Sequence, residues 1–91
     1  MIIEEGDFRL KQVSEESIFF DLELLYTVNK GKKTERQEFK NAGYGLTLET
    51  AIRKIANYRV SLQHIDEAIT LKTYFKKYKK ELDDLKKLLN D

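Results

Sequence analysis

Hydrophobic and polar residues alternate along two neighbouring stretches near the start of the chain. Residues 8–13, Phe-Arg-Leu-Lys-Gln-Val, follow the period of two that is typical of a half-buried strand. Residues 18–28 follow the same period over a longer stretch, and the polar residues 14–17 between them predict a four-residue turn. We therefore predict two antiparallel strands. The apolar face of the second strand comprises Ile18, Phe20, Leu22, Leu24, Tyr26 and Val28.

A third strand is predicted over residues 33–41, because a loop that contains Gly31 can turn the chain back after residue 28. The polar and charged side chains of this stretch suit an outer strand, since they protect a free edge from pairing with other chains. Gly43-Tyr44-Gly45 follows and is expected to end the sheet. The first half of the chain therefore predicts a three-stranded antiparallel meander.

Two helices are predicted after the strands, at residues 47–60 and 70–90. Thr47 and Thr70 stand where helix N-caps are expected, and apolar residues recur at helical spacing after each of them. Residues 61–69 carry no clear pattern and leave three alternatives open: a loop, a short strand, or the first turns of the last helix. We expect all 91 residues to form a single α+β domain of order β-β-β-α-α. The first helix is expected to cover the apolar face of the sheet.

The last predicted helix carries a heptad pattern. Its apolar residues are spaced by 4, 3, 4, 3 and 4 positions, as are the a and d positions of a coiled coil. Such a helix reaches roughly 30 Å, which makes it about as long as the domain itself. The stripe is expected either to pack within its own chain or to form a homodimer interface. It comprises Leu71, Phe75, Tyr78, Leu82, Leu85 and Leu89.

The composition argues against most catalytic chemistry. The chain contains no cysteine and one histidine, His64, which excludes disulfides, thiolate catalysis and most zinc sites. Gly43-Tyr44-Gly45 has neither of the glycine spacings that cradle a phosphate. We expect a protein without enzymatic activity, cofactor or metal. The lack of cysteine favours a reducing compartment, the cytoplasm, and apolar runs of at most three residues argue against a membrane span.

Charge is distributed unevenly along the chain, although the net charge is only +1. Residues 1–24 hold seven acids and two bases, a balance of −5, whereas residues 25–63 hold eight bases and three acids, a balance of +5. Charged patches act locally, within a Debye length of about 8 Å. The excess of bases can therefore attract a nucleic acid despite the low net charge, and a nucleic acid is one candidate partner. Its binding residues would be Lys30, Lys32, Lys33, Arg36, Lys76, Lys77, Lys79 and Lys80.

The second face of residues 18–28 is the other candidate surface. It combines apolar with acidic side chains, a composition that a protein partner can recognise. Acids on the central strand also repel phosphate, which disfavours nucleic acid at this face. The leading prediction is therefore a protein-binding module that contacts its partner through Phe19, Asp21, Glu23 and Leu25.

Residues 43–59, Gly-Tyr-Gly-Leu-Thr-Leu-Glu-Thr-Ala-Ile-Arg-Lys-Ile-Ala-Asn-Tyr-Arg, ahead of residues 71–79, Leu-Lys-Thr-Tyr-Phe-Lys-Lys-Tyr-Lys, resemble small uncharacterised proteins of phages and prophages of Gram-positive bacteria. The resemblance covers about a third of the chain and carries over no functional residue. It implies a cytoplasmic accessory protein that binds a host protein in an infected cell. Some such proteins inhibit CRISPR nucleases by placing acidic surface in the nucleic-acid groove, and the acidic residues 1–24 are compatible with that role.

Overall fold

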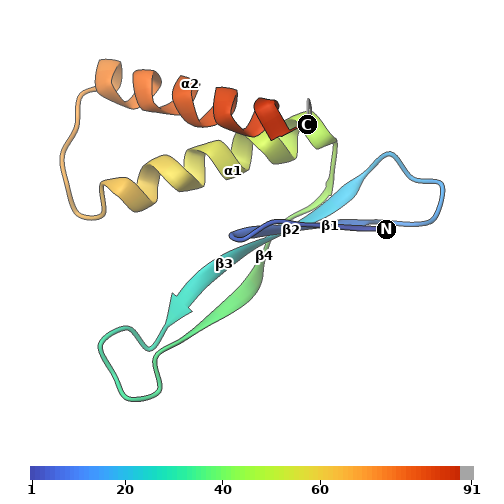
Figure 1. Cartoon of the computed structure of the whole chain (residues 1–91), viewed down its shortest axis with the longest axis horizontal. Helices are drawn as coiled ribbons and strands as arrows, with labels where there is room; N and C mark the ends of the chain where they lie inside the picture. The colour runs from blue at the N-terminus through green and yellow to red at the C-terminus, as the bar shows by residue number, and fades with distance from the viewer. Residues whose placement is uncertain (89–91) are drawn as a thin grey trace. The chain divides into compact units, whose positions relative to one another are not determined.

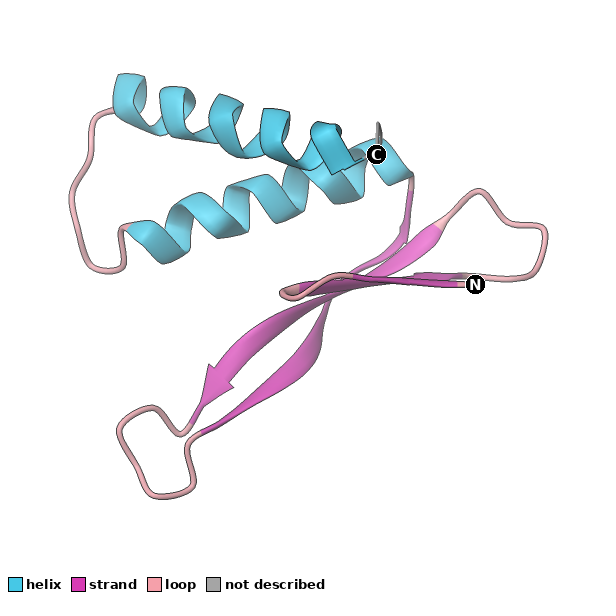
Figure 2. Cartoon of the chain, viewed as in Figure 1, coloured by secondary structure: helices cyan, strands magenta, loops and turns pink. Residues whose placement is uncertain are grey.

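The computed structural model describes residues 1–88 and has an α+β fold (Figures 1 and 2). The chain divides into two compact units, Met1–Ala51 and Ile52–Asp91. The first unit contains an antiparallel sheet and the start of helix α1, and the second contains the rest of α1 and helix α2. The elements are β1 (Ile2–Glu4), β2 (Phe8–Gln12), β3 (Phe20–Val28), β4 (Arg36–Leu46), α1 (Leu48–Gln63) and α2 (Leu71–Lys87).

The sheet has four strands, whereas the sequence predicts three. Its order is β1-β2-β3-β4, and each strand is antiparallel to its neighbour. The additional strand is β1, in which Ile3 pairs with Leu10 of β2. A strand of three residues is too short to show an alternating pattern, so it forms because the edge of β2 offers unpaired backbone groups.

The prediction that Gly43-Tyr44-Gly45 ends the sheet is wrong. These residues lie inside β4, which starts at Arg36 and extends to Leu46 rather than covering residues 33–41. The register between β4 and β3 shifts in this region, which marks a β-bulge. Gly45 has a φ of 58°, a left-handed conformation that glycine adopts without steric cost. Its backbone N–H donates a hydrogen bond to Asp21 Oδ1 at 3.0 Å, which holds the bulge against β3.

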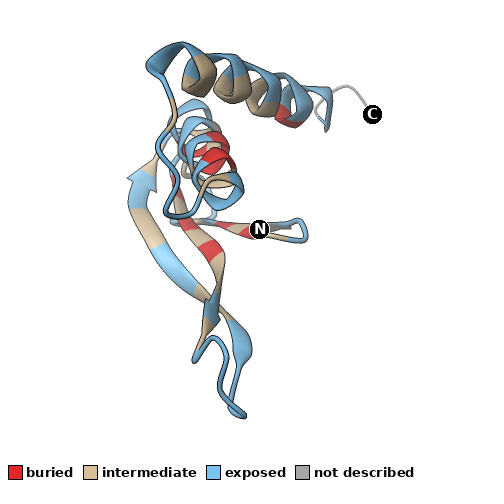
Figure 3. Ribbon diagram, turned by 90° about the vertical axis from the view of Figure 1, so that its left-hand side faces the viewer, coloured by how far each residue is buried: buried red, intermediate tan, exposed pale blue. Residues whose placement is uncertain are grey.

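The central strands bury alternate side chains, as the pattern predicts (Figure 3). Ile18 departs from the pattern, because it precedes the first residue of β3 and is 72% exposed. Alternation places a side chain on one face only where the backbone is paired in the sheet. The core side chains of the sheet, none of them more than 7% exposed, are Phe8 and Leu10 of β2 and Phe20, Leu22 and Leu24 of β3.

The second unit is a hairpin of two helices (Figure 1). Helix α1 ends at Gln63, three residues beyond the predicted end, and a turn follows at residues 64–66. The ambiguous residues 61–69 are therefore the end of α1, that turn and the start of a short connection. Asp66 has a φ of 60°, a left-handed conformation that acids and amides adopt more readily than most residues.

Both predicted helix N-caps are confirmed. Thr47 Oγ1 accepts a hydrogen bond from the backbone N–H of Thr50 at 3.2 Å. Thr70 Oγ1 accepts one from the N–H of Thr73 at 3.1 Å. Each cap satisfies one of the N–H groups that a helix leaves without an internal partner in its first turn.

The apolar stripe of α2 is not uniformly buried. Leu85 is buried and only 3% exposed, and Tyr78 and Leu82 are half-buried. Leu71 and Phe75 are 70% and 50% exposed. The sixth residue of the predicted stripe, Leu89, lies outside the described residues. The first turns of α2 therefore present apolar side chains to solvent, and the homodimer through this stripe stays a prediction.

Candidate binding surfaces

The two acids of the predicted contact surface lie on the sheet face opposite the core, among basic residues of β2. Arg9 pairs with Glu23 in the sheet register, and Lys11 pairs with Asp21. Glu23 Oε1 lies 3.2 Å from Arg9 Nε and 3.3 Å from Lys11 Nζ. Glu23 is thus held between two cations, and its side chain is only 18% exposed. For both reasons it offers little free negative charge to a partner.

The other members of this face are also engaged inside the sheet. The guanidinium of Arg9 lies over the ring of Phe39, 3.9 Å from its centroid, a cation–π contact. Phe39 of β4 pairs with Leu25 of β3 in the register. Asp21 is the acceptor for the N–H of Gly45. Asp21 and Glu23 therefore make contacts within the sheet, and Leu25 lies opposite Phe39 in the register. The strand register also places Arg9 and Lys11 of β2 opposite these acids, and the role of the acids as partner contacts stays a prediction.

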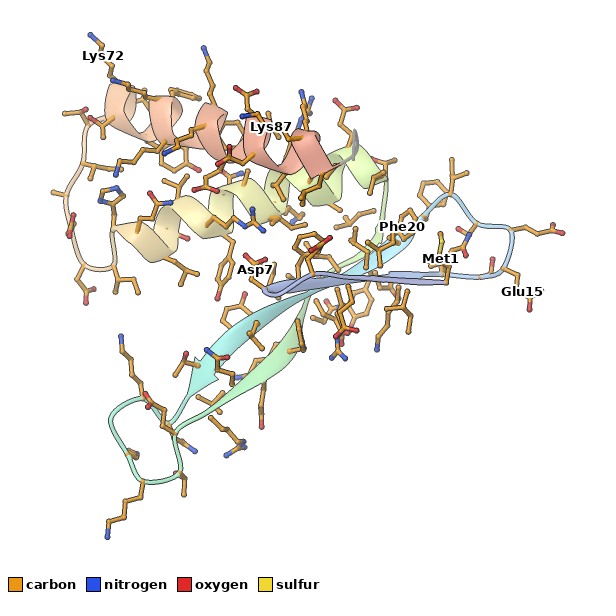
Figure 4. The ribbon with its side chains drawn as sticks, in the orientation of Figure 1. Met1, Asp7, Glu15, Phe20, Lys72 and Lys87 are labelled. Carbon is orange, nitrogen blue, oxygen red and sulfur yellow. The ribbon has the colours of Figure 1, made fainter. Side chains whose placement is uncertain are left out.

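Exposed apolar side chains lie at the end of the sheet where β3 starts and β4 finishes, since Phe20 pairs with Leu46, and we call it the apolar end. Met1 O accepts a hydrogen bond from Gln12 N–H, and Phe19 O accepts one from Val13 N–H, which brings the starts of β1 and β3 to the finish of β2. Figure 4 labels Met1 and Phe20 at this end of the sheet. The exposed fractions are Met1 72%, Ile2 59%, Val13 52%, Ile18 72%, Phe19 43% and Tyr44 75%.

The apolar end holds every large hydrophobic side chain that is exposed in residues 1–51. Two exposed acids, Glu15 and Glu16, lie in the adjoining loop between β2 and β3. Phe19 belongs to the predicted contact surface, whereas the other five apolar side chains do not. Val13 and Ile18 stand at the ends of predicted strands, whereas Met1, Ile2 and Tyr44 stand outside the predicted strands altogether, where no alternation indicates whether they are buried.

The basic residues predicted to bind nucleic acid are divided between two places. Lys30, Lys32 and Lys33 are exposed in the loop between β3 and β4. Arg36 is instead paired with Glu38 of the same strand, with Nε and Oε1 2.6 Å apart. The loop therefore presents three cationic side chains, whereas the fourth predicted base, Arg36, lies in β4 and is paired with an acid.

Three of the predicted lysines of α2 line one groove, which we call the lysine groove. It has a volume of about 470 Å³. Glu81 Oε1 in this groove accepts a hydrogen bond from Gln63 Nε2 at 2.7 Å, and Glu81 Oε2 lies 3.9 Å from Arg59 Nη1. Glu81 is thus occupied by partners from α1. The groove is lined by Gln63, Thr73, Lys76, Lys77, Lys80 and Glu81.

Aromatic residues of α2 differ in their availability. The Tyr74 hydroxyl donates a hydrogen bond to Asn57 Oδ1, and its ring stacks on Tyr78 with centroids 6.3 Å apart. The rings of Phe75 and Tyr74 are arranged edge to face, with centroids 6.1 Å apart, and Phe75 is 50% exposed. The heptad pattern assigns Phe75 to the buried stripe and leaves Tyr74 free, whereas in the structure Phe75 is the more accessible ring.

The single histidine lies in the turn after α1. His64 Nδ1 is 2.9 Å from Glu67 Oε2, and the His64 side chain is 15% exposed. Among residues 1–88, no group of three or more histidine or acidic side chains is arranged to hold a metal ion. No helix in the described part of the chain is long and apolar enough to cross a membrane.

Comparison with known proteins adds no relative: no protein-family model, curated protein or solved structure matches the chain.

Proposed function

We propose that the chain is a non-enzymatic protein-binding module that docks a partner at the apolar end of its sheet. The observation that carries the proposal is the concentration of exposed apolar side chains there, with Ile18 and Tyr44 each more than 70% exposed. Exposed apolar groups that gather in one place, beside polar side chains, are typical of protein interaction sites.

Neighbouring acids suit the rim of such a site. Glu15 and Glu16 are exposed in the loop beside Phe19, and rim charges steer a partner of opposite charge and select against wrong ones. The partner contact predicted for Asp21 and Glu23 stays a prediction, and both residues also make contacts within the sheet. They fix the bulge and the β2–β3 pairing, and so they hold the backbone on which the apolar side chains are mounted.

The binding free energy expected from covering these side chains follows from their exposed fractions. Complete burial of a large apolar side chain is worth about 1.5–3 kcal/mol. Ile18 and Phe19 expose 72% and 43% of their surface, so a partner that covers both gains about 2–3 kcal/mol, or about 30- to 150-fold in Kd.

The resemblance to small phage proteins supports a host protein as the partner and the cytoplasm as the place of action. An inhibitor that occupies a host protein surface, such as that of a CRISPR nuclease, needs no chemistry of its own. Surface recognition by the apolar end and its acidic rim is sufficient for that mode of action.

Affinity capture tests the proposal. Tagged wild-type protein and the variant Ile18→Ser/Phe19→Ser are incubated with a lysate of the organism that encodes the chain, and captured proteins are quantified by mass spectrometry. The control is Leu62→Ser/Ile65→Ser, which removes two side chains of the second unit that are 48% and 54% exposed. We expect one protein to be retained by the wild type and the control and lost by the variant. Equal retention by all three would refute the proposal.

A second candidate function, nucleic-acid binding, rests on α2. The observation that favours it is the meeting of Lys76, Lys77 and Lys80 around the lysine groove, on the same helix as the exposed ring of Phe75. Lysines attract the phosphate backbone and an exposed ring can stack on a base. Helix α2 carries seven lysines and three acids, a balance of +4.

The salt dependence of binding separates the two functions. Nucleic-acid binding predicts that affinity for a mixed oligonucleotide pool falls steeply as salt rises. It also predicts a further loss for Lys76→Glu/Lys80→Glu and no loss for Ile18→Ser/Phe19→Ser. If no oligonucleotide binds at low salt, the second candidate is eliminated and the first is unaffected.

A further inference from the structure

The outer edge of β4 carries unpaired backbone groups. β4 is the last strand in the order β1-β2-β3-β4, so one of its edges has no neighbour among the described strands. Leu25 N–H donates to Asp7 O at 2.9 Å, which points the backbone groups of Leu25 toward β2. Since successive residues of a strand point to opposite edges, Leu24 and Tyr26 direct theirs toward β4.

The same alternation identifies which residues of β4 face outward. Leu24 pairs with Lys40 and Tyr26 pairs with Glu38, so these two residues of β4 bond to β3. The intervening residues therefore direct their N–H and C=O groups to the free edge. They are Gln37, Phe39 and Asn41, and together they present three donors and three acceptors.

The sequence of this segment has an unusual symmetry. Residues 37–41 read Gln-Glu-Phe-Lys-Asn. On either side of Phe39 stand one acid and one base, and beyond them stand two amides. If the segment is reversed, each amide falls on an amide and each charge falls on its opposite. An antiparallel copy of the same strand is the partner that reverses it.

We propose that a second copy of the chain pairs with β4 in antiparallel register centred on Phe39. In this register Phe39 lies opposite Phe39 of the partner subunit, and each Glu38 lies opposite a Lys40. Each Gln37 lies opposite an Asn41. The outward backbone groups then meet one another and form six hydrogen bonds, and cross-strand ion and aromatic pairs add to them.

Charge selects this register over its neighbours. Centring the pair on Glu38 would place the two Glu38 side chains opposite each other and Arg36 opposite Lys40. Centring it on Lys40 would place the two Lys40 side chains opposite each other. Like charges opposite one another destabilise a strand pair. Sliding the partner strand by a single residue would instead place backbone groups that point to the free edge opposite backbone groups that point toward the partner's own β3. The register centred on Phe39 avoids all of these.

The side chains needed for the pairing are accessible. Glu38 is 40% exposed, although it also contacts Arg36 of its own strand, and Lys40 is exposed. The bulge begins beyond Asn41, so residues 36–41 form a regular ladder with β3. On the other face the partner would extend the row of Leu25 and Phe39, over which Arg9 lies. A regular, accessible edge of this kind is a template for strand addition.

Sedimentation equilibrium with charge variants tests the proposal. Over concentrations from about 10 µM to about 1 mM, the wild type is expected to dimerise. Glu38→Lys alone and Lys40→Glu alone each turn two attractive pairs into two repulsive ones, and each should weaken the dimer about tenfold or more. The two single variants mixed together should form a heterodimer, because every charge then meets its opposite. The double variant Glu38→Lys/Lys40→Glu should dimerise as the wild type does.

Two results would overturn the proposal. One is a wild-type protein that stays monomeric over the whole concentration range. The other is a dimer that neither single variant weakens, which would assign the interface elsewhere, as to the stripe of α2. Amide hydrogen exchange provides a second readout that needs no variant. On dimerisation the amides of Gln37, Phe39 and Asn41 should become protected, and unchanged exchange at all three in a dimeric sample would also refute the pairing.

Discussion

The exposure of Ile18 separates this structure from the sequence pattern, and it can be tested by comparison with Leu22. Both residues belong to one apolar alternation, which predicts that both are buried. In the structure Leu22 is 0% exposed and Ile18 is 72% exposed. We therefore compare Leu22→Ala with Ile18→Ala, which truncate side chains of equal size at the two positions.

The expected magnitudes differ severalfold. Truncating a fully buried leucine costs about 2–5 kcal/mol, because it removes buried methyl groups and leaves a cavity. Leu22 pairs with Leu10, which is also buried, so little relaxation can fill that cavity. A 91-residue protein has a total stability of about 5–14 kcal/mol, and the loss corresponds to a fall in Tm of about 10–30 °C. Truncating an exposed side chain changes stability by less than about 0.5 kcal/mol.

Urea unfolding followed by circular dichroism measures both variants under the same conditions. We expect the midpoint of Leu22→Ala to fall strongly and that of Ile18→Ala to stay close to the wild type. If Ile18→Ala destabilises the protein as much as Leu22→Ala, Ile18 belongs to the core. The apolar end would then lose one of its three most exposed members, and the proposed docking site would lose its main support.

Three further predictions concern local contacts. Gly45→Ala should destabilise the sheet by about 1–2 kcal/mol, because Gly45 has a φ of 58°, whereas Gly6→Ala, at a position with open space, should not; urea midpoints of the two decide. Thr70→Ala should remove the N-cap of α2 and lower the stability by about 1 kcal/mol. Thermal unfolding followed by the helical circular-dichroism signal measures this loss, and an unchanged Tm would contradict it. Arg9→Met should cost about 1–2 kcal/mol, since it removes the ion pair with Glu23 and the cation–π contact; an unaltered unfolding midpoint would show that neither contact stabilises the sheet.

Local patterns predicted the elements that are long and amphipathic. Both helices are present within three residues of their predicted bounds, and so are the strands predicted at residues 8–13 and 18–28. Residues 89 and 90, which the prediction includes in the last helix, lie outside the residues that the structure describes. Two features were not predictable in this way. β1 depends on the edge of β2, and the continuation of β4 through Gly45 depends on the side chain of Asp21. Both are contacts between distant residues, which a local pattern cannot contain.

The candidate surfaces were predictable only by composition. The acids of β3 read as a free contact surface, because nothing in the sequence fixes the register that sets Arg9 opposite Glu23. The exposure of Phe75 was hidden by the heptad spacing, since spacing identifies one face of a helix but not how far a neighbouring element covers it. Phe19 was predicted to be exposed and is 43% exposed, although it precedes the first residue of β3 rather than standing on a face of that strand.

Photo-cross-linking at Tyr44 tests the central claim most directly. Tyr44 and Phe75 are aromatic and exposed, 75% and 50%, so the larger aromatic side chain of p-benzoylphenylalanine can extend into solvent at either position. One variant places the photoreactive group at the apolar end, and the other places it beside the lysine groove. We expect irradiated cells to yield a discrete protein adduct from position 44 and none from position 75. A protein or nucleic-acid adduct formed from position 75 alone would contradict docking at the apolar end.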